Sequence, residues 1–192
     1  DSLGSYNNRK KITVRLENNT ECYVEIQNWD HANKTAWLWV KVPSVSATVD
    51  TILYLYYDKN RADNTTYIGD TGSTPAKTVW DSNYKIVTHL EQDPSGTAPQ
   101  ILDSTSNGFN GTSAGTMTTS DLVAAKINKG LDFDGSNDKI GFGDAFTTST
   151  LMVEALVYFN TISPADREYL VSKMGASGEW FLIVGCDNKV KC

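Results

Sequence analysis

An acidic turn after residue 130 is the clearest candidate for a chemical site. Five side chains with oxygen donors surround Gly135 within seven residues: Asp132, Asp134, Ser136, Asn137 and Asp138. Hard cations take carboxylate, amide and backbone oxygens as ligands, so this spacing predicts a calcium site. A second oxygen-rich segment, 103–112, could complete the site with Asp103. The alternative is a metal-free strand end that runs into an Asp-Gly turn, since the distal bidentate glutamate of an EF-hand is absent.

Aromatic and amide side chains form the second group of candidates, because sugar rings stack on aromatic faces and amides hydrogen-bond to sugar hydroxyls. The predicted glycan contacts are Trp37, Trp39, Trp180, Asn107 and Asn110. Trp37 and Trp39 are two residues apart, so on a strand they face the same side and could form a platform. The alternative is that other parts of the fold cover this face.

Catalytic patterns are incomplete in this chain. Residues 91–96 begin the Glu-x-Asp-x-x-Glu pattern of jelly-roll glycoside hydrolases, but Gly96 replaces the second glutamate and a proline interrupts the strand. The two histidines, His31 and His89, are not accompanied by a Gly-x-Ser-x-Gly motif. We therefore predict that the protein is not an enzyme and that His89 is a structural residue.

Composition limits the partners. The 192 residues include 23 Asp and Glu against 17 Lys and Arg, which gives a formal net charge of -6. This balance argues against nucleic acid or an anionic membrane as the main partner. No apolar run approaches the roughly 18 residues needed to span a bilayer. Abundant Thr, Ser, Asn and Gly are typical of an all-β, loop-rich extracellular protein.

Short motifs predict covalent modifications. Four Asn-x-Ser/Thr sequons are candidate glycosylation sites, although chance produces several in a chain so rich in Asn and Thr: Asn18, Asn33, Asn64 and Asn110. Cys186 and Cys192 flank an Asp-Asn turn and could form a disulfide across a hairpin if their registers match. Cys22 is then left over and is predicted to be free and buried.

Alternating apolar and polar residues predict strands in the first third of the chain. These strands span residues 11–16, 22–26, 36–42 and 51–57. The last two are apolar on both faces, so we expect central strands that are covered on both sides. Residues 58–77 have no periodicity and are rich in Asn, Asp, Thr, Gly and Pro, which predicts a linker or domain boundary.

A second series of short strands is expected after residue 84, at a spacing typical of a β-sandwich. The predicted ranges are 85–90, 130–133, 139–142, 151–159, 169–173, 180–185 and 189–192. Helix is limited to a single turn at Ser163 and another within residues 120–127.

Several segments carry a resemblance to known families. Residues 22–30 (CYVEIQNWD), 36–44 (AWLWVKVPS) and 50–57 (DTILYLYY) resemble a small all-β domain of unknown function found in prokaryotic and viral surface proteins. Such domains commonly precede a concanavalin A-like module. The second region resembles a module of this kind, laminin-G-like or pentraxin-like, through residues 79–81 (VWD), 89–91 (HLE), 103–112 (DSTSNGFNGT), 130–138 (GLDFDGSND) and 152–157 (MVEALV). The resemblance implies an all-β protein with a small β-sandwich domain over residues 1–78 and a jelly-roll sandwich over residues 79–192.

The resemblance also implies a class of function. We expect a non-catalytic extracellular, cell-surface or virion-surface module that binds a glycan or a partner protein in adhesion, with or without Ca2+. Laminin-G-like modules usually extend further, so we expect an incomplete jelly roll whose missing strands come from a longer parent chain or a neighbouring copy. The alternative is a structural subunit of an extracellular filament, sheath or tail fibre that assembles by pairing of strand edges.

Overall fold

We describe the protein from a computed structural model. The structure describes residues 3, 5–143, 150–160, 168–173, 180–184 and 190–191. It divides into two compact units, Asp1–Thr147 and Thr148–Cys192. Each unit is described by itself below.

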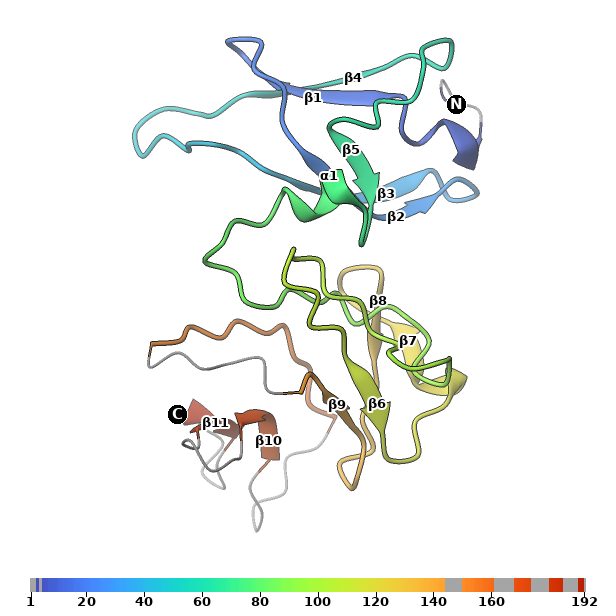
Figure 1. The fold of residues 1–192 in the computed structure, drawn as a ribbon, viewed down its shortest axis with the longest axis vertical. Coiled ribbons are helices and arrows are strands. Elements are labelled where there is room, and N and C mark those ends of the chain that lie inside the picture. The colour runs from blue at the N-terminus through green and yellow to red at the C-terminus, as the bar shows by residue number, and fades with distance from the viewer. Residues whose placement is uncertain are drawn as a thin grey trace. The chain divides into compact units, whose positions relative to one another are not determined.

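Two small sheets form the first part of the larger unit (Figure 1). β1 (Ile12–Leu16) pairs with β4 (Leu53–Tyr57) in antiparallel orientation. β2 (Val24–Asp30) lies between β3 (Thr35–Val40), which is antiparallel to it, and β5 (Ile68–Asp70), which is parallel. The four strands predicted in this region are confirmed, with ends that differ by up to four residues.

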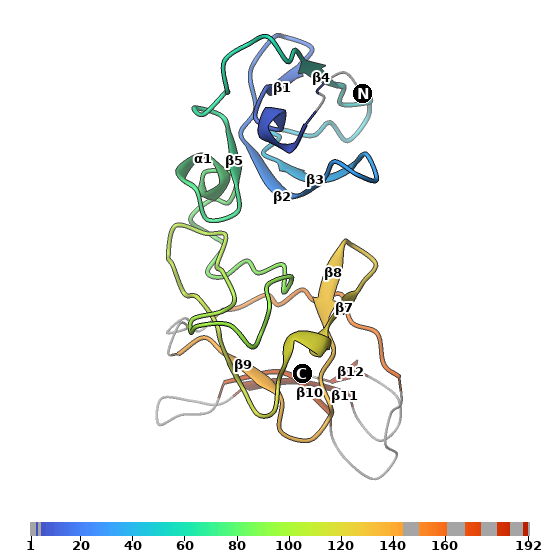
Figure 2. The same cartoon turned by 90° about the vertical axis from the view of Figure 1, so that its right-hand side faces the viewer.

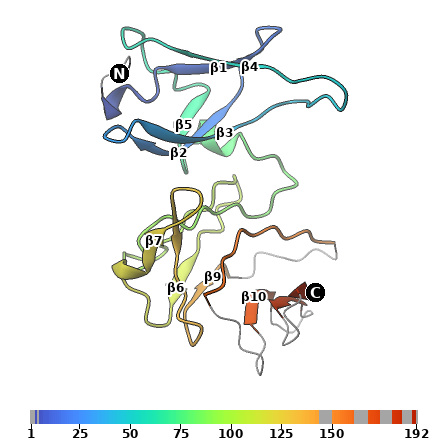
Figure 3. The same ribbon diagram turned by 180° about the vertical axis from the view of Figure 1, so that it is seen from behind.

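The hydrophobic core lies between these two sheets, which form two layers in Figure 3. Ile12 and Val14 point inward from β1 because side chains on a strand alternate with a period of two. Val24 and Ile26 face them from β2 for the same reason, and Ile68 adds a third strand. Burial of these aliphatic side chains stabilises the pair of sheets by roughly 1.5–3 kcal/mol for each fully buried side chain.

A β-bulge in β2 changes which residues face away from this core. The register with β3 shifts between Ile26 and Asn28, so Gln27 is the extra residue. Glu25, Gln27 and Asn28 therefore all contact partners outside the core, in the segment after residue 70. The bulge thus gives one short strand an apolar face and a continuous polar face.

The segment 58–77 is not a linker, contrary to our prediction. Ile68 is 1% exposed and belongs to the core, and the segment contains both β5 and the helix α1 (Thr74–Lys77). Figure 2 shows α1 beside β5. A side chain at Gly69 would lie 2.7 Å from Cγ of Pro75 and 3.2 Å from N of Ala76, so glycine permits this close approach. A strand of three residues is too short to show a period in the sequence.

The remainder of the larger unit contains two short antiparallel ladders. β6 (Thr112–Ala114) pairs with β9 (Lys139–Gly141), and β7 (Leu122–Ala124) pairs with β8 (Lys129–Leu131). The larger unit also contains two 3-10 turns, Tyr6–Asn8 and Thr119–Asp121. Residues 85–90 form no strand, because the backbone of Val87 bonds to Ser104 and to the Asp103 side chain rather than to a neighbouring strand.

The smaller unit contains a three-stranded antiparallel sheet in the order β10–β11–β12. Its strands are Glu168–Lys173, Trp180–Val184 and Val190–Lys191, which agrees with three predicted ranges. The strand predicted at 151–159 is absent, and these residues are irregular. Ser163 lies outside the described residues.

Strands therefore make up most of the regular secondary structure among the described residues, which is consistent with the all-β class that we predicted. The concanavalin A-like jelly roll over residues 79–192 stays a prediction. Among the residues that the structure describes, no helix has the length and apolar character that a membrane crossing requires.

Candidate functional site

A buried carboxylate on the polar face of β2 organises the larger unit. Glu25 is fully buried, and its Oε1 accepts hydrogen bonds from Thr71 Oγ1 and Ser104 Oγ, both at 2.7 Å. His89 Nε2 lies 3.2 Å from the same oxygen, and Trp80 Nε1 donates to Oε2 at 2.7 Å. Burial raises the pKa of Glu25, but the hydrogen bonds from His89, Thr71 and Ser104 outweigh it and hold the pKa below its usual value.

Aromatic rings enclose this carboxylate. The imidazole of His89 stacks on Trp39 with ring centres 5.3 Å apart, and Trp39 contacts Trp80 at 5.5 Å. Tyr84 meets Trp80 edge to face at 5.2 Å. The side chain of His89 is only 5% exposed. Its contact with Glu25 joins two parts of the chain that are 64 positions apart in sequence. This placement agrees with a structural role for His89.

A second polar network extends from the bulge. Gln27 Oε1 accepts a hydrogen bond from Trp39 Nε1 at 2.7 Å, and its amide donates to Glu91 at 3.1 Å. Asn128 donates to the same Glu91 oxygen at 2.7 Å and accepts from Asn28 at 2.6 Å. Glu91, which we considered for hydrolase chemistry, therefore serves as an acceptor that ties β2 to residue 128.

The predicted metal ligand Asp103 is buried, and its oxygens are already occupied. Its two carboxylate oxygens accept hydrogen bonds from the backbone N–H groups of Val87, Thr105 and Phe109 and from the Thr105 hydroxyl. Asn110 Oδ1 accepts from the backbone N–H of Asp103 at 2.9 Å. These contacts organise the loop 103–110 without any added ligand.

The acidic turn is also held by internal hydrogen bonds. Asp134 is exposed, and its Oδ1 accepts hydrogen bonds from the backbone N–H groups of Ser136, Asn137 and Asp138, which lower the pKa of Asp134. Asp138 accepts from Asp134 N and from Thr116 N. Within the described part of the chain, no three His, Cys, Asp or Glu side chains gather as metal ligands. The calcium site, including Asp132, stays a prediction.

Three of the predicted glycan contacts form hydrogen bonds within the fold: Trp39, Asn107 and Asn110. Trp37 and Trp39 are both half-buried, and the indole nitrogen of Trp39 bonds to Gln27. The amide of Asn107 donates to the carbonyl oxygens of Tyr84 and Lys85, and Asn110 bonds to Asp103. Trp180 begins β11, and its side chain lies outside the described residues.

The predicted modification sites have different surroundings. Asn18 and Asn33 are exposed. The Asn64 amide nitrogen, to which a glycan would attach, donates to Ile12 O and Glu21 Oε1 and is part of the fold. Cys22 is free and buried as predicted, and burial raises the pKa of its thiol. Cys186 and Cys192 lie outside the described residues.

Among the described residues of the larger unit, the longest run of exposed large apolar side chains is 52–57, which contains β4. All five residues of β4 are exposed, with Leu55, Tyr56 and Tyr57 each at 54%. We predicted a central strand covered on both faces, and this prediction is wrong because β4 pairs only with β1 among the described strands. We missed this surface because a strand with two apolar faces has the same sequence whether it is buried or exposed.

The hydrogen-bonding edge of β4 follows from its register with β1. Cys22 N bonds to Val14 O, so Val14 directs its backbone groups away from β4. Backbone groups alternate in direction along a strand, so Arg15 and Thr13 point toward β4 and bond to their partners Tyr54 and Tyr56. The N–H and C=O groups on the open edge therefore belong to Leu53, Leu55 and Tyr57.

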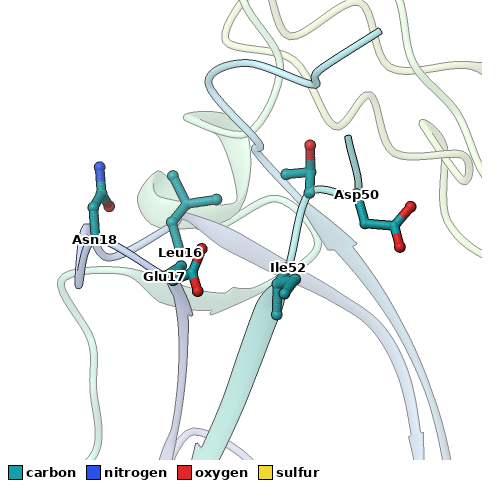
Figure 4. Close-up of a pocket in the computed structure, with 6 residues that line it drawn as sticks. Leu16, Glu17, Asn18, Asp50 and Ile52 are labelled. Atoms are coloured by element: carbon teal, nitrogen blue, oxygen red, sulfur yellow. The ribbon is translucent and has the colours of Figure 1, made fainter. Parts of the chain in front are cut away.

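The two ends of β4 differ in charge. A hollow of about 390 Å3 lies beside the first end and is lined by Leu16, Glu17, Asn18, Asp50, Thr51 and Ile52 (Figure 4). The carboxylates of Glu17 and Asp50 make this end acidic. Lys11 and Lys59 stand at the other end, where Lys11 Nζ donates to Lys59 O. Residues 51–57 between these ends carry no charge.

Comparison with known proteins identifies one part of the chain. Residues 9–83 match a family described as Domain of unknown function (DUF2341). This match covers the two facing sheets and extends through α1, in agreement with the resemblance of the first region to an all-β domain of unknown function. No curated protein matches, and no solved structure matches.

Proposed function

We propose that this protein is a non-catalytic module that binds a partner polypeptide, which adds a strand to the open edge of β4. The observation that carries the proposal is an exposed, uncharged strand whose outer N–H and C=O groups have no strand partner among the described residues. Addition of a strand to such an edge is a common mode of peptide recognition.

The composition of β4 supports this function. Exposed edges are usually protected by charges, proline or a bulge, since a bare edge promotes aggregation. β4 has none of these between Leu53 and Tyr57. Tyrosine is enriched in protein interfaces because it combines a large apolar ring with a polar hydroxyl. An exposed edge of this kind is expected to be covered in use.

A polypeptide partner is favoured over a glycan. Trp39 Nε1, Asn107 Nδ2 and Asn110 Oδ1 already form hydrogen bonds within the fold, whereas β4 offers apolar surface and backbone groups without a strand partner among the described residues. The composition of the chain favours an extracellular, cell-surface or virion-surface location. The partner is either another copy of this chain or a different polypeptide, including the remainder of a longer parent chain.

A labelled strand peptide tests the proposal. The probe is fluorescein-Lys-Val-Tyr-Val-Tyr-Val-Lys, and its control is N-methylated at the five central residues so that neither edge can donate. The probe is held at nanomolar concentration, and we expect its fluorescence anisotropy to rise to a plateau as the protein is titrated through and above the micromolar range, whereas the control should show no binding. Leu55→Pro removes one N–H on the open edge and no bond to β1, so it should abolish binding, whereas Leu55→Ala should retain it. Equal binding of both peptides, or of neither, would refute the proposal.

A further inference from the structure

We infer that the strand that adds to β4 is β4 of a second copy of this chain, in antiparallel orientation. The inference rests on the proposed function and specifies the partner. Three features of β4 support it: its hydrogen-bonding register, the side chains that would meet across the pair, and the opposite charges at its two ends.

The backbone of β4 is complementary to itself. A two-fold axis at Leu55 brings Leu55 opposite Leu55 of the other copy and Leu53 opposite Tyr57. These residues carry the N–H and C=O groups of the open edge, as the register with β1 requires. Facing residues of this kind exchange two hydrogen bonds, so three such pairs give about six bonds between the copies. The result is a continuous sheet in the order β1–β4–β4–β1.

The side chains are complementary in the same register. Leu53, Leu55 and Tyr57 share one face, so leucine meets leucine and tyrosine meets leucine across the axis. Tyr54 and Tyr56 share the other face, where their rings lie 6.3 Å apart within one copy. In the pair, Tyr54 faces Tyr56 of the other copy at a non-hydrogen-bonded position, where cross-strand side chains approach most closely. Each such apolar or aromatic pair stabilises a sheet.

Charge selects the antiparallel orientation. The acidic end of β4, with Glu17 and Asp50 (Figure 4), comes beside the end of the other copy that carries Lys11 and Lys59. A parallel arrangement would place acid beside acid. Arg61 and Asp58 at the basic end lie 3.8 Å apart, so they contribute no net charge there. Opposite charges therefore meet at both ends of the antiparallel pair.

The exposed area is sufficient for a weak dimer. The three tyrosines of β4 are 42–54% exposed, which leaves roughly 100 Å2 of each accessible. With the neighbouring aliphatic side chains, the two copies together could bury on the order of 1,000 Å2, the lower bound for a specific interface. We therefore expect a dissociation constant that is roughly micromolar. The two-fold pairing uses each open edge once, so it closes as a dimer and does not propagate into a filament.

Disulfide trapping in the full chain tests the register. All variants carry Cys186→Ser and Cys192→Ser as a common background. Leu55→Cys places two thiols opposite each other, with Cα atoms about 5.5 Å apart, a distance that a disulfide can span. We expect Leu55→Cys to form a covalent dimer on mild oxidation. Leu53→Cys alone should not, but a mixture of Leu53→Cys with Tyr57→Cys should. The control is the chain with only Cys186→Ser and Cys192→Ser, which retains the buried Cys22.

Sedimentation velocity over a range of concentrations tests the association itself. Wild-type protein should change from monomer to dimer across the micromolar range. Leu55→Lys places two ammonium groups opposite each other and should raise the dissociation constant at least tenfold. Val45→Lys adds the same charge at an exposed valine outside β4 and should leave the dissociation constant unchanged. Circular dichroism of each variant confirms that it is folded.

The possible outcomes separate this inference from the proposed function. A protein that stays monomeric at all concentrations but binds the strand peptide would overturn the second copy as the partner and leave strand addition intact. A monomer that binds no strand peptide would overturn both. A dimer that Leu55→Lys does not weaken, or that Leu53→Cys crosslinks by itself, would overturn the β4 register.

Discussion

Replacement of Glu25 is the sharpest test of how the larger unit is held together. Glu25→Ala removes the acceptor for four donor groups: Thr71 Oγ1, Trp80 Nε1, His89 Nε2 and Ser104 Oγ. The two hydroxyls and the imidazole can find other partners by rotation or by a change of tautomer, but the indole N–H of Trp80 can only donate. An unsatisfied buried donor costs about 1–3 kcal/mol, and removal of one partner of a buried pair costs about 3–5 kcal/mol.

We therefore expect Glu25→Ala to lower the free energy of unfolding by about 3–5 kcal/mol. Glu25→Gln is the matched control, because its amide oxygen can still accept from Trp80 while its NH2 group donates to the hydroxyls. Its cost should be about 1–2 kcal/mol, the difference between charge-assisted and neutral hydrogen bonds. Urea unfolding followed by tryptophan fluorescence measures both values. A cost below about 1 kcal/mol for Glu25→Ala, or equal costs for the two variants, would refute this account.

The stability contributed by Glu25 should also depend on pH. Burial raises its pKa, but the hydrogen bonds from its donors lower it further, so the folded pKa lies below the unfolded value of about 4.3. A carboxyl group of this kind contributes its full stabilisation above the unfolded pKa and loses it as the pH falls through the folded pKa. The difference in urea midpoint between wild type and Glu25→Gln should therefore shrink below about pH 4.3. A constant difference from pH 7 to pH 3 would contradict this explanation.

Three further predictions concern other parts of the larger unit. Gly69→Ala should cost about 1–3 kcal/mol because its methyl group would clash with α1, whereas Gly141→Ala meets only ordinary contacts and should change stability by less than about 0.5 kcal/mol in the same urea assay. Asp70→Asn should cost at most about 1 kcal/mol at pH 7 and less at pH 3. Burial raises the pKa of Asp70, but its partly exposed ion pair with Arg9 lowers it further. Cys22 should resist iodoacetamide at pH 8 in the folded protein and react in urea, because burial shields its thiol and raises the thiol pKa. Peptide mass mapping measures the labelling, and rapid labelling without urea would contradict the burial of Cys22.

Sequence periodicity predicts the strands that alternate clearly. In β1, Ile12 and Val14 alternate with polar residues such as Thr13, and these two apolar positions are the buried ones. The same reasoning fails for β5, where three residues are too few to establish a period. It also fails for β4, because two apolar faces do not distinguish a central strand from an exposed one.

The polar contacts around Glu25 could not be predicted from sequence because they connect distant residues. Glu25 and Ser104 are 79 positions apart, and no local pattern indicates that they meet. One local signal was available: a glutamate between Val24 and Ile26 must face away from the core that these residues form. The bulge at Gln27 has no such signal, because the shift depends on the pairing with β3.

Amide hydrogen exchange along β4, measured by NMR on the full chain, tests the central claim most directly. Tyr54 and Tyr56 bond to β1 and should be protected at every concentration. Leu53, Leu55 and Tyr57 lie on the open edge, so their amides should exchange quickly in dilute protein and become protected at high concentration or with the strand peptide. If these three amides exchange quickly under all conditions, the open edge of β4 is not a binding site.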